Sequence, residues 1–287
     1  MQDTRFSLLA IVLVAGLLTG CQGKVSVDLT TTPPGDRDIL QVVAGVLGLE
    51  FSRSDGSTET LEFTASESVD FMEFRNGDLL TLFTNEPLPA GTYTGVRLLF
   101  DANADGRFVT DGLAGSAPLL LVPGDYADFD FTVEDEESSS ASLTLTLDLR
   151  QSLSFNATND EYTLQPYLRS VLSADAGVLE GFVSIVCPAG ASLLEGGAVY
   201  LFQGQDIVPD DRDGNGIEPY ATGSLIQDLL TDQFSYQLLD LPAGEYTIAA
   251  TCNGDLEDPT TDTLLTFRGT RNVNVSRDSV TTASVTG

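Results

Sequence analysis

The stretch SLTLTLDL at residues 142–149 decides the fold class of this 287-residue chain. Leucine alternates there with threonine or aspartate, and successive side chains of a β-strand point to opposite faces. The pattern therefore predicts a strand with one buried apolar face and one polar, solvent-facing side. Residues 129–133 (FDFTV) and 25–29 (VSVDL) repeat the alternation. The body of the chain is thus expected to be β throughout.

Turn residues separate the alternating stretches. The triplets SDG at 54–56 and RNG at 75–77 are typical turn sequences. Many short strands joined by such turns predict sandwiches or barrels, and we expect two antiparallel β-sandwiches of immunoglobulin or transthyretin type. Residues 39–49 fit a helix or a buried strand, and their valines and glycines favour a strand. A short helix is expected over residues 69–74.

A repeated heptapeptide indicates the domain organisation. LPAGTYT at 88–94 recurs as LPAGEYT at 241–247. Proline suits the first corner of a turn and glycine a positive φ, so the tyrosine should begin the next strand with its ring inward. The repeat therefore predicts two units, each with one strand that begins after an LPAG turn. We place the join in the small-residue linker 173–177, between domains at 21–172 and 178–287.

Composition excludes several function classes. The chain has 43 Asp and Glu against 13 Lys and Arg, a formal net charge of −30, and no His. Without histidine there is no Ser-His-Asp or Cys-His catalysis and no His-ligated metal. The negative charge would repel phosphates, which argues against a nucleic-acid partner. Two carboxylates can hydrolyse glycosides, but among 43 acids some pair is always available.

The N-terminus has the character of a secretory leader. The apolar run at 8–18 is shorter than a transmembrane helix requires. The tetrapeptide Leu-Thr-Gly-Cys follows at 18–21. This resembles a bacterial lipobox, which implies removal of residues 1–20 and a diacylglycerol on Cys21. Gln22 after that cysteine favours the outer membrane. The alternative is an ordinary cleaved signal peptide.

Cys187 and Cys252 remain once Cys21 is acylated. Both lie in alternating, strand-like stretches, and an envelope compartment is oxidising. We expect a disulfide between them, worth about 4 kcal/mol in the chain-entropy model. Two free buried thiols are the alternative.

Two acidic loops have oxygen ligands at alternate positions, as calcium loops do. The candidate ligands are Asp101, Asn103, Asp105 and Asp111 in the first loop, and Asp211, Asp213 and Asn215 in the second. Neither loop has the glutamate that an EF-hand requires at its twelfth position, so any Ca²⁺ site would be looser and weak. Ordinary turns rich in Asp, Asn and Gly are the alternative.

Three arginines stand in strand-like stretches: Arg97, Arg150 and Arg169. Each is expected to point outward or to form an ion pair at the rim of a sheet. Recognition of an anionic ligand is the alternative.

Four segments, in order, resemble one bacterial lipoprotein family. They are VSVDLTTTP at 25–33, LPAGTYTGVRLLFDA at 88–102, LDLRQSL at 147–153 and YTLQPYLRSV at 162–171. The family is known only as domain of unknown function 4382. Thr31 and Thr32 stand where it usually has Asp-Ala, and Gln165 where it usually has Arg. Residues 178–287 are similar to transthyretin-like modules of carboxypeptidase regulatory domains, through Gly181-Phe182-Val183 and the second LPAG motif.

These observations favour a lipid-anchored cell-envelope protein with a non-enzymatic structural, adhesive or interaction role. Calcium would stabilise it if the two acidic loops bind Ca²⁺. Its partners would be the membrane, through the lipid, and an envelope protein or a glycan. A surface module that binds carbohydrate or another small ligand is the first alternative. A carboxylate-based hydrolase, with two acids facing each other across a cleft, is the second.

Overall fold

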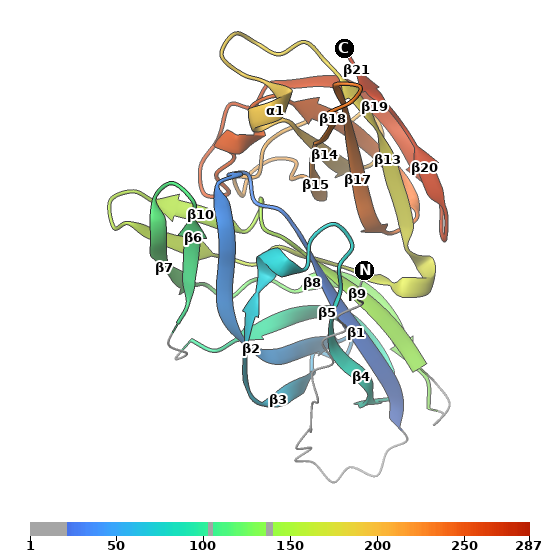
Figure 1. Cartoon of the computed structure of the whole chain (residues 1–287). Coiled ribbons are helices and arrows are strands. Elements are labelled where there is room, and N and C mark those ends of the chain that lie inside the picture. The colour runs from blue at the N-terminus through green and yellow to red at the C-terminus, as the bar shows by residue number, and fades with distance from the viewer. Residues whose placement is uncertain (1–21, 103–105, 136–139) are drawn as a thin grey trace.

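The structure, a computed structural model, describes residues 22–102, 106–135 and 140–287 (Figure 1). Strands make up 59% of the described residues and helices 5%, so the prediction of an all-β fold is confirmed. None of the helices in the described ranges has the length and apolar character needed to cross a bilayer.

The first fourteen elements end at residue 175, and we call them the N-terminal unit. Their bounds are β1 Gln22–Thr32, β2 Ile39–Arg53, β3 Thr58–Asp70, η1 Phe71–Glu73, β4 Leu80–Pro89, β5 Gly91–Phe100, β6 Phe108–Asp111, β7 Gly115–Leu121, β8 Ala127–Val133, β9 Ser140–Asp148, β10 Leu153–Asn156, β11 Glu161–Leu164, β12 Leu168–Leu172 and η2 Ser173–Asp175. They form a four-stranded sheet in the order β12-β9-β1-β4 and an eight-stranded sheet in the order β10-β11-β7-β6-β2-β5-β8, with β3 paired to β2.

The remaining elements form the C-terminal unit. Their bounds are β13 Gly177–Ser184, α1 Leu193–Gly196, β14 Ala198–Gln203, β15 Ala221–Ser224, β16 Ile226–Asp228, β17 Gln233–Leu241, β18 Gly244–Thr251, η3 Gly254–Leu256, β19 Phe267–Val275, β20 Val280–Thr282 and β21 Val285–Thr286. One sheet has the order β16-β17-β13-β20, with β21 also on β13, and the other has the order β15-β14-β18-β19. Pairing is antiparallel except for β1 with β9, β7 with β11, and β13 with β20 and β21.

Strand β9 shows how the alternating sequence is used. Its leucines, from Leu143 to Leu147, are fully buried in the core of the N-terminal unit. The sequence predicted that the opposite, polar face would be exposed to solvent, and this prediction is wrong. Thr144, Thr146 and Asp148 are 6%, 4% and 0% exposed, because β15 and β17 of the C-terminal unit pack against this sheet. The polar side of β9 is therefore an internal interface.

The repeated heptapeptide begins an equivalent strand in each unit. Tyr93 in β5 and Tyr246 in β18 are buried, and each donates a hydrogen bond from its hydroxyl to the carbonyl of the proline four residues earlier, at 2.6 and 2.8 Å. The inward tyrosine is thus confirmed in both copies. Gly91 has the expected positive φ, at 150°, whereas Gly244 has an ordinary φ.

Two local expectations have different outcomes. Residues 39–49 are strand, within β2, as expected. Residues 69–74 contain only a single 3-10 turn, η1, after β3 has continued to Asp70. Asp70 ends the strand because its carboxylate accepts the Met72 amide at 3.0 Å. The expected helix is therefore wrong in extent.

A disulfide joins Cys187 to Cys252. The two cysteines lie just beyond the ends of β13 and β18, which belong to different sheets of the C-terminal unit. The bond therefore fastens the two layers of that sandwich to each other across a sequence separation of 65 residues.

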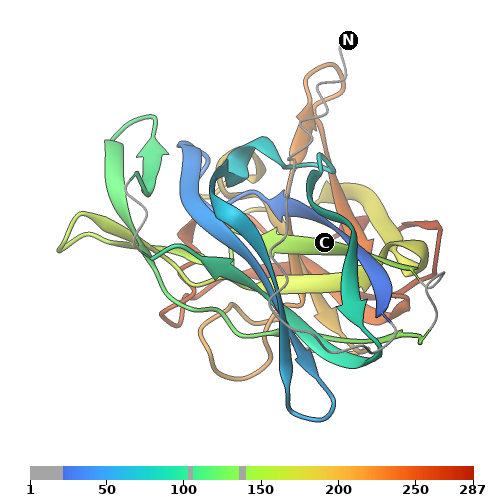
Figure 2. The ribbon, with the colours of Figure 1, turned by 90° about the horizontal axis from the view of Figure 1, so that it is seen from below.

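Figures 1 and 2 show that the hairpins β6–β7 and β10–β11 extend to one side of the N-terminal unit. This extension continues the eight-stranded sheet beyond the sandwich. It provides one wall of a groove described below.

Candidate functional site

Charged and aromatic side chains collect where the two units meet, and we call this set the polar joint. Its members from the N-terminal unit are Asp148, Arg150, Tyr167 and Arg169, and those from the C-terminal unit are Arg212, Tyr220, Thr222, Ser224, Asp240 and Gly254. The first four lie in the segments 147–153 and 162–171, at the ends of strands that face the C-terminal unit.

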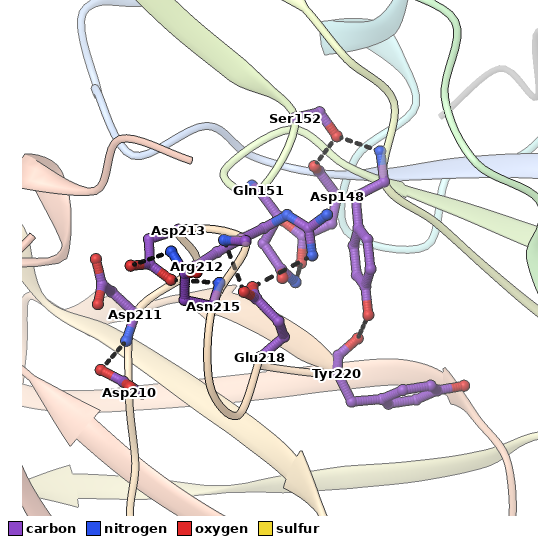
Figure 3. A network of polar contacts seen from close by, with 12 residues as sticks. Asp148, Gln151, Ser152, Asp210, Asp211, Arg212, Asp213, Asn215, Glu218 and Tyr220 are labelled. Carbon is purple, nitrogen blue, oxygen red and sulfur yellow. Dashed lines mark hydrogen bonds and ion pairs between the residues drawn. The ribbon is translucent and has the colours of Figure 1, made fainter. Parts of the chain in front are cut away.

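Asp148 connects the units most directly. Its carboxylate is fully buried and accepts hydrogen bonds from both the amide and the hydroxyl of Thr222, at 2.9 and 2.8 Å. The side chain of Gln151 donates a further bond at 2.9 Å, from the tight turn that follows β9 (Figure 3). A buried carboxylate is stable only with such donors around it. Asp148 therefore ties strand β15 to the end of β9.

Arg150 donates two hydrogen bonds to the C-terminal unit. It is 3% exposed, and its guanidinium donates to the carbonyl of Gly254 and to the hydroxyl of Ser224, the latter at 3.1 Å. A Cβ atom on Gly254 would lie 3.0 Å from the Arg150 guanidinium. Glycine at that position thus permits the close approach of the arginine.

Aromatic rings cover two of the three arginines of the joint, Arg212 and Arg169. The Arg212 guanidinium lies 4.1 Å from the centre of the Tyr167 ring, and Arg169 lies 5.6 Å from that of Tyr220. The Tyr167 hydroxyl donates to the Tyr220 carbonyl at 3.4 Å (Figure 3). Burial raises the pKa of Tyr167 to about 12, so its hydroxyl remains a neutral donor.

The three arginines singled out in the sequence have different surroundings. Arg97 forms an ion pair with Glu50 at 2.6 Å and lies over the Tyr126 ring, as expected of a rim arginine. For Arg150 and Arg169 the expectation of an outward position is wrong, because the C-terminal unit covers the sheet that carries them. No ion pair of the described residues includes either of these two.

A groove of about 360 Å³ lies beside the joint, and we call it the acidic groove. One wall is the hairpin extension, with Phe155 and Tyr162, whose ring centres are 4.7 Å apart. The other wall is the 255–258 segment of the C-terminal unit. Its carboxylates are Asp36, Asp111, Asp160, Asp255, Glu257 and Asp258, and none of the lysines and arginines that the structure describes lines it.

Glu257 has an unusual environment for an acid. Its carboxylate accepts the Tyr200 hydroxyl at 2.6 Å and the Arg212 amide at 3.0 Å. Burial raises the pKa of Glu257 to about 7, against the combined effect of these two donors and of nearby Arg150. The ionisation of Glu257 thus occurs close to neutral pH, within the network that positions Arg212 over Tyr167.

The first candidate calcium loop is only partly visible, because Asn103 and Asp105 lie outside the described residues. Asp111 ends β6, and its carboxylate accepts the amides of Leu113 and Ala114 at 2.6 and 2.8 Å. It is therefore a turn-capping residue in the structure. The Asp101 amide donates to the Gly45 carbonyl at 2.9 Å.

The second loop is fully described, and its oxygens bind the chain itself. Asp211 accepts the Thr263 amide, and Asp213 accepts the Asn215 amide at 2.8 Å. Glu218 accepts the Gly214 amide at 2.8 Å. Within the described parts of the chain, no three Asp, Glu, His or Cys side chains are placed to hold a metal ion. Asp211 and Asp213 therefore accept amides of the chain in this structure, and Ca²⁺ binding by Asp211, Asp213 and Asn215 stays a prediction.

The sequence did not reveal the half of the joint that the C-terminal unit supplies. Thr222 and Ser224 belong to the short run ATGS of β15, which has no distinctive pattern. Arg212 lies inside the acidic loop, where the neighbouring acids predicted a bound Ca²⁺ ion and not an arginine packed on an aromatic ring. Glu257 is one of three acids in the stretch DLED at 255–258, and only its tertiary partners distinguish it. Cys21 and the leader 1–20 lie outside the described residues.

The joint predicts a large effect of removing the Asp148 carboxylate. Asp148→Ala leaves the donors of Thr222 and Gln151 unpaired in the interior, so we expect the free energy of unfolding to fall by about 3 kcal/mol. Denaturant titration monitored by circular dichroism measures it. Asp28→Ala is the matched control, since Asp28 accepts a bond from Thr81 at the exposed edge of the same sheet, and should cost less than about 1 kcal/mol. An equal loss of unfolding free energy in Asp148→Ala and Asp28→Ala would contradict the role of Asp148 in joining the two units.

Glu257 predicts a pH dependence of stability. Its pKa is about 7 in the fold and ordinarily 4.5, so the folded protein holds this proton more tightly. The resulting stabilisation is complete below pH 4.5 and is lost as the pH rises through 7, a difference of about 3 kcal/mol. Unfolding of wild type and Glu257→Gln at pH 4.5, 6 and 7.5 should show this decline only in wild type. Glu245→Gln, an exposed control, should behave as wild type, and parallel curves for all three proteins would refute the assignment.

The solved structures that are similar to this chain include three distant likenesses. A leucine-rich repeat protein from Bacteroides thetaiotaomicron is 13% identical with a TM-score of 0.23; the match covers 93% of this chain and 26% of that one, so the chain spans about a quarter of that protein's length. GBS52, the minor pilin of Streptococcus agalactiae, is 11% identical with a TM-score of 0.21, over 91% and 94% of the chains. The fimbrial anchor protein Mfa2 of Porphyromonas gingivalis is 10% identical with a TM-score of 0.21, over 82% and 80%. Scores at this level transfer no function.

A search of curated proteins finds no match. A family model does match, over residues 22–166, which is half of the chain and includes the first part of the polar joint. This match agrees with the resemblance of the segments at 25–33, 88–102, 147–153 and 162–171. The chain belongs to the family described as domain of unknown function (DUF4382).

Proposed function

We propose that the protein is a lipid-anchored component of the bacterial cell envelope with a non-enzymatic structural or adhesive role. In this role the two sandwiches form one rigid body that holds its far end away from the membrane. The observation that carries the proposal is the polar joint, in which Asp148 and Arg150 of one unit bind Thr222, Ser224 and Gly254 of the other.

The joint supports a mechanical role because its bonds lie inside the protein. Hydrogen bonds to buried charges are stronger than those at an exposed surface, and breaking one leaves a buried group unpaired. Force applied along the chain would have to separate β9 from β15 against these bonds. The Cys187–Cys252 disulfide then carries the load between the two layers of the C-terminal unit.

The anchor is part of the proposal and depends on the leader 1–20 and on Cys21. A lipid at Cys21 would be joined almost directly to β1, which begins at Gln22. Two or three acyl chains hold a protein stably on a bilayer. The strong negative charge of the chain favours a well-hydrated surface that does not self-associate.

Expression of the full chain in a Gram-negative host tests this role. Wild type should incorporate an alkyne-labelled fatty acid and sediment with the outer membrane, whereas Cys21→Ser should remain unlabelled and soluble. Cells with the anchored protein should be retained several-fold better on polystyrene under flow than cells with Cys21→Ser. An unlabelled wild-type protein would refute the anchor, and equal retention would refute the adhesive role.

A second candidate function is binding of a carbohydrate or another small ligand at the cell surface. The acidic groove favours it, since ring faces and carboxylate acceptors together suit a polyhydroxylated ligand. Phe155 is 44% exposed and offers its ring to the groove. A hydrolase is less well supported by this site, because both oxygens of Glu257, the acid with the raised pKa, are bonded within the protein.

A glycan array probed with the full chain in detergent tests the groove. Phe155→Ala should weaken binding to any positive glycan by about tenfold, because it removes the exposed ring. Phe182→Ala is the matched control, as Phe182 is similarly exposed, at 52%, on β13 and outside the groove. An array without positives, or equal loss in the two variants, would reject this function.

A further inference from the structure

A cavity of about 70 Å³ lies inside the interface between the units, apart from the acidic groove. Its lining includes Thr30, Thr146 and Arg169 from the four-stranded sheet of the N-terminal unit, and Ser224 and Asp240 from the C-terminal unit. The strand register pairs Thr146 with both Thr30 and Arg169. The three side chains therefore form one row across β1, β9 and β12.

Arg169 brings a positive charge to this row without a bonded counter-charge. It is 4% exposed and belongs to no ion pair of the described residues. One terminal nitrogen donates to the Asp240 carbonyl at 3.2 Å, while Nε has no hydrogen-bond partner. A buried cation with an unused donor is costly unless an anion or acceptor compensates it.

Thr146 supplies a second unused donor in the same row. Its side chain is 4% exposed and its hydroxyl oxygen has no partner, whereas the Thr30 hydroxyl donates to the Phe74 carbonyl at 2.9 Å. Most buried hydroxyls are hydrogen-bonded, so the unused hydroxyl of Thr146, a residue of the cavity lining, is a donor for a bound group.

We propose that this cavity binds a small monovalent anion, either chloride or a carboxylate, held by the guanidinium of Arg169 and the hydroxyl of Thr146. The anion bridges the two units, because the cavity walls come from both. Bound there, it completes the polar joint and stabilises the docked arrangement of the sandwiches. The inference is independent of the adhesive and ligand-binding roles.

Size and charge define the ligand class. A single water needs at least about 10–15 Å³ of such volume, so 70 Å³ accepts a monatomic ion with a water, or a group of acetate size, but not a hexose. Asp240 is the competing negative group, since its carboxylate belongs to a residue of the same lining and interacts with Arg169. Removing that charge should strengthen anion binding.

Thermal unfolding of the full chain at constant ionic strength tests the site. Sodium gluconate, whose anion is too large for the cavity, is replaced stepwise by sodium chloride or sodium acetate. The melting temperature of wild type should rise with saturation in at least one series, and the series that responds identifies the anion as monatomic or as a carboxylate. No specific rise in either series would overturn the proposal.

Three variants assign the effect to this cavity. Thr146→Val keeps the shape of the side chain and removes its hydroxyl, so the apparent Kd should rise at least about tenfold. Thr144→Val is the matched control on the same face of β9, since its hydroxyl bonds Ser173 outside the cavity, and should leave the Kd unchanged. Asp240→Asn should lower it. Equal Kd values for wild type and Thr146→Val would refute the site.

A crystallographic measurement avoids dependence on stability. Crystals of the full-length protein grown or soaked in sodium bromide should show an anomalous peak within hydrogen-bonding distance of Arg169 and Thr146. A cavity that contains only water at high bromide concentration would refute the proposal for a monatomic ion, and acetate density there would be required instead.

Discussion

The arrangement of the whole molecule depends on one buried carboxylate, that of Asp148, at the point where two sandwiches meet. A charge without solvent must be surrounded by donors, and Thr222 of the C-terminal unit supplies two of them. Arg150, two residues later, places its guanidinium against the carbonyl of Gly254 and the hydroxyl of Ser224. The segment 147–153 thus ends a core strand and starts the contact between units.

The contact between the units explains why polar residues of the N-terminal unit are buried. The sheet β12-β9-β1-β4 has leucines on its inner face and threonine, aspartate and arginine on its outer face, and the C-terminal unit covers the outer face around Thr30, Thr146 and Arg169. The rings of Tyr220 and Tyr167 pack against the guanidinium groups of Arg169 and Arg212 at this boundary. The acidic groove and the cavity at Arg169 both lie along this boundary. Residues of both units line each of them.

Much of the fold could be predicted because it depends on local pattern. The alternation at 142–149 specified a strand and its core face, and the LPAG repeat specified an inward tyrosine in each unit. The two cysteines that remain beside Cys21 indicated a disulfide. The acidic loop at 211–215 shows the limit of such reasoning. Alternate oxygens there fit a metal loop and a capped turn equally well, and only the positions of the backbone amides decide which of them the oxygens bind.

The sequence by itself determined that the chain is β-rich, that its apolar residues fall on one face of each strand, and that it is strongly acidic, because periodicity, turn residues and charge are local properties. Only the tertiary structure decided that the polar face of β9 is internal, that Arg150 and Arg169 are buried, and that Glu257 has a pKa near 7. Burial and hydrogen bonding depend on which strands from distant parts of the chain pack together, and no local pattern encodes the partner.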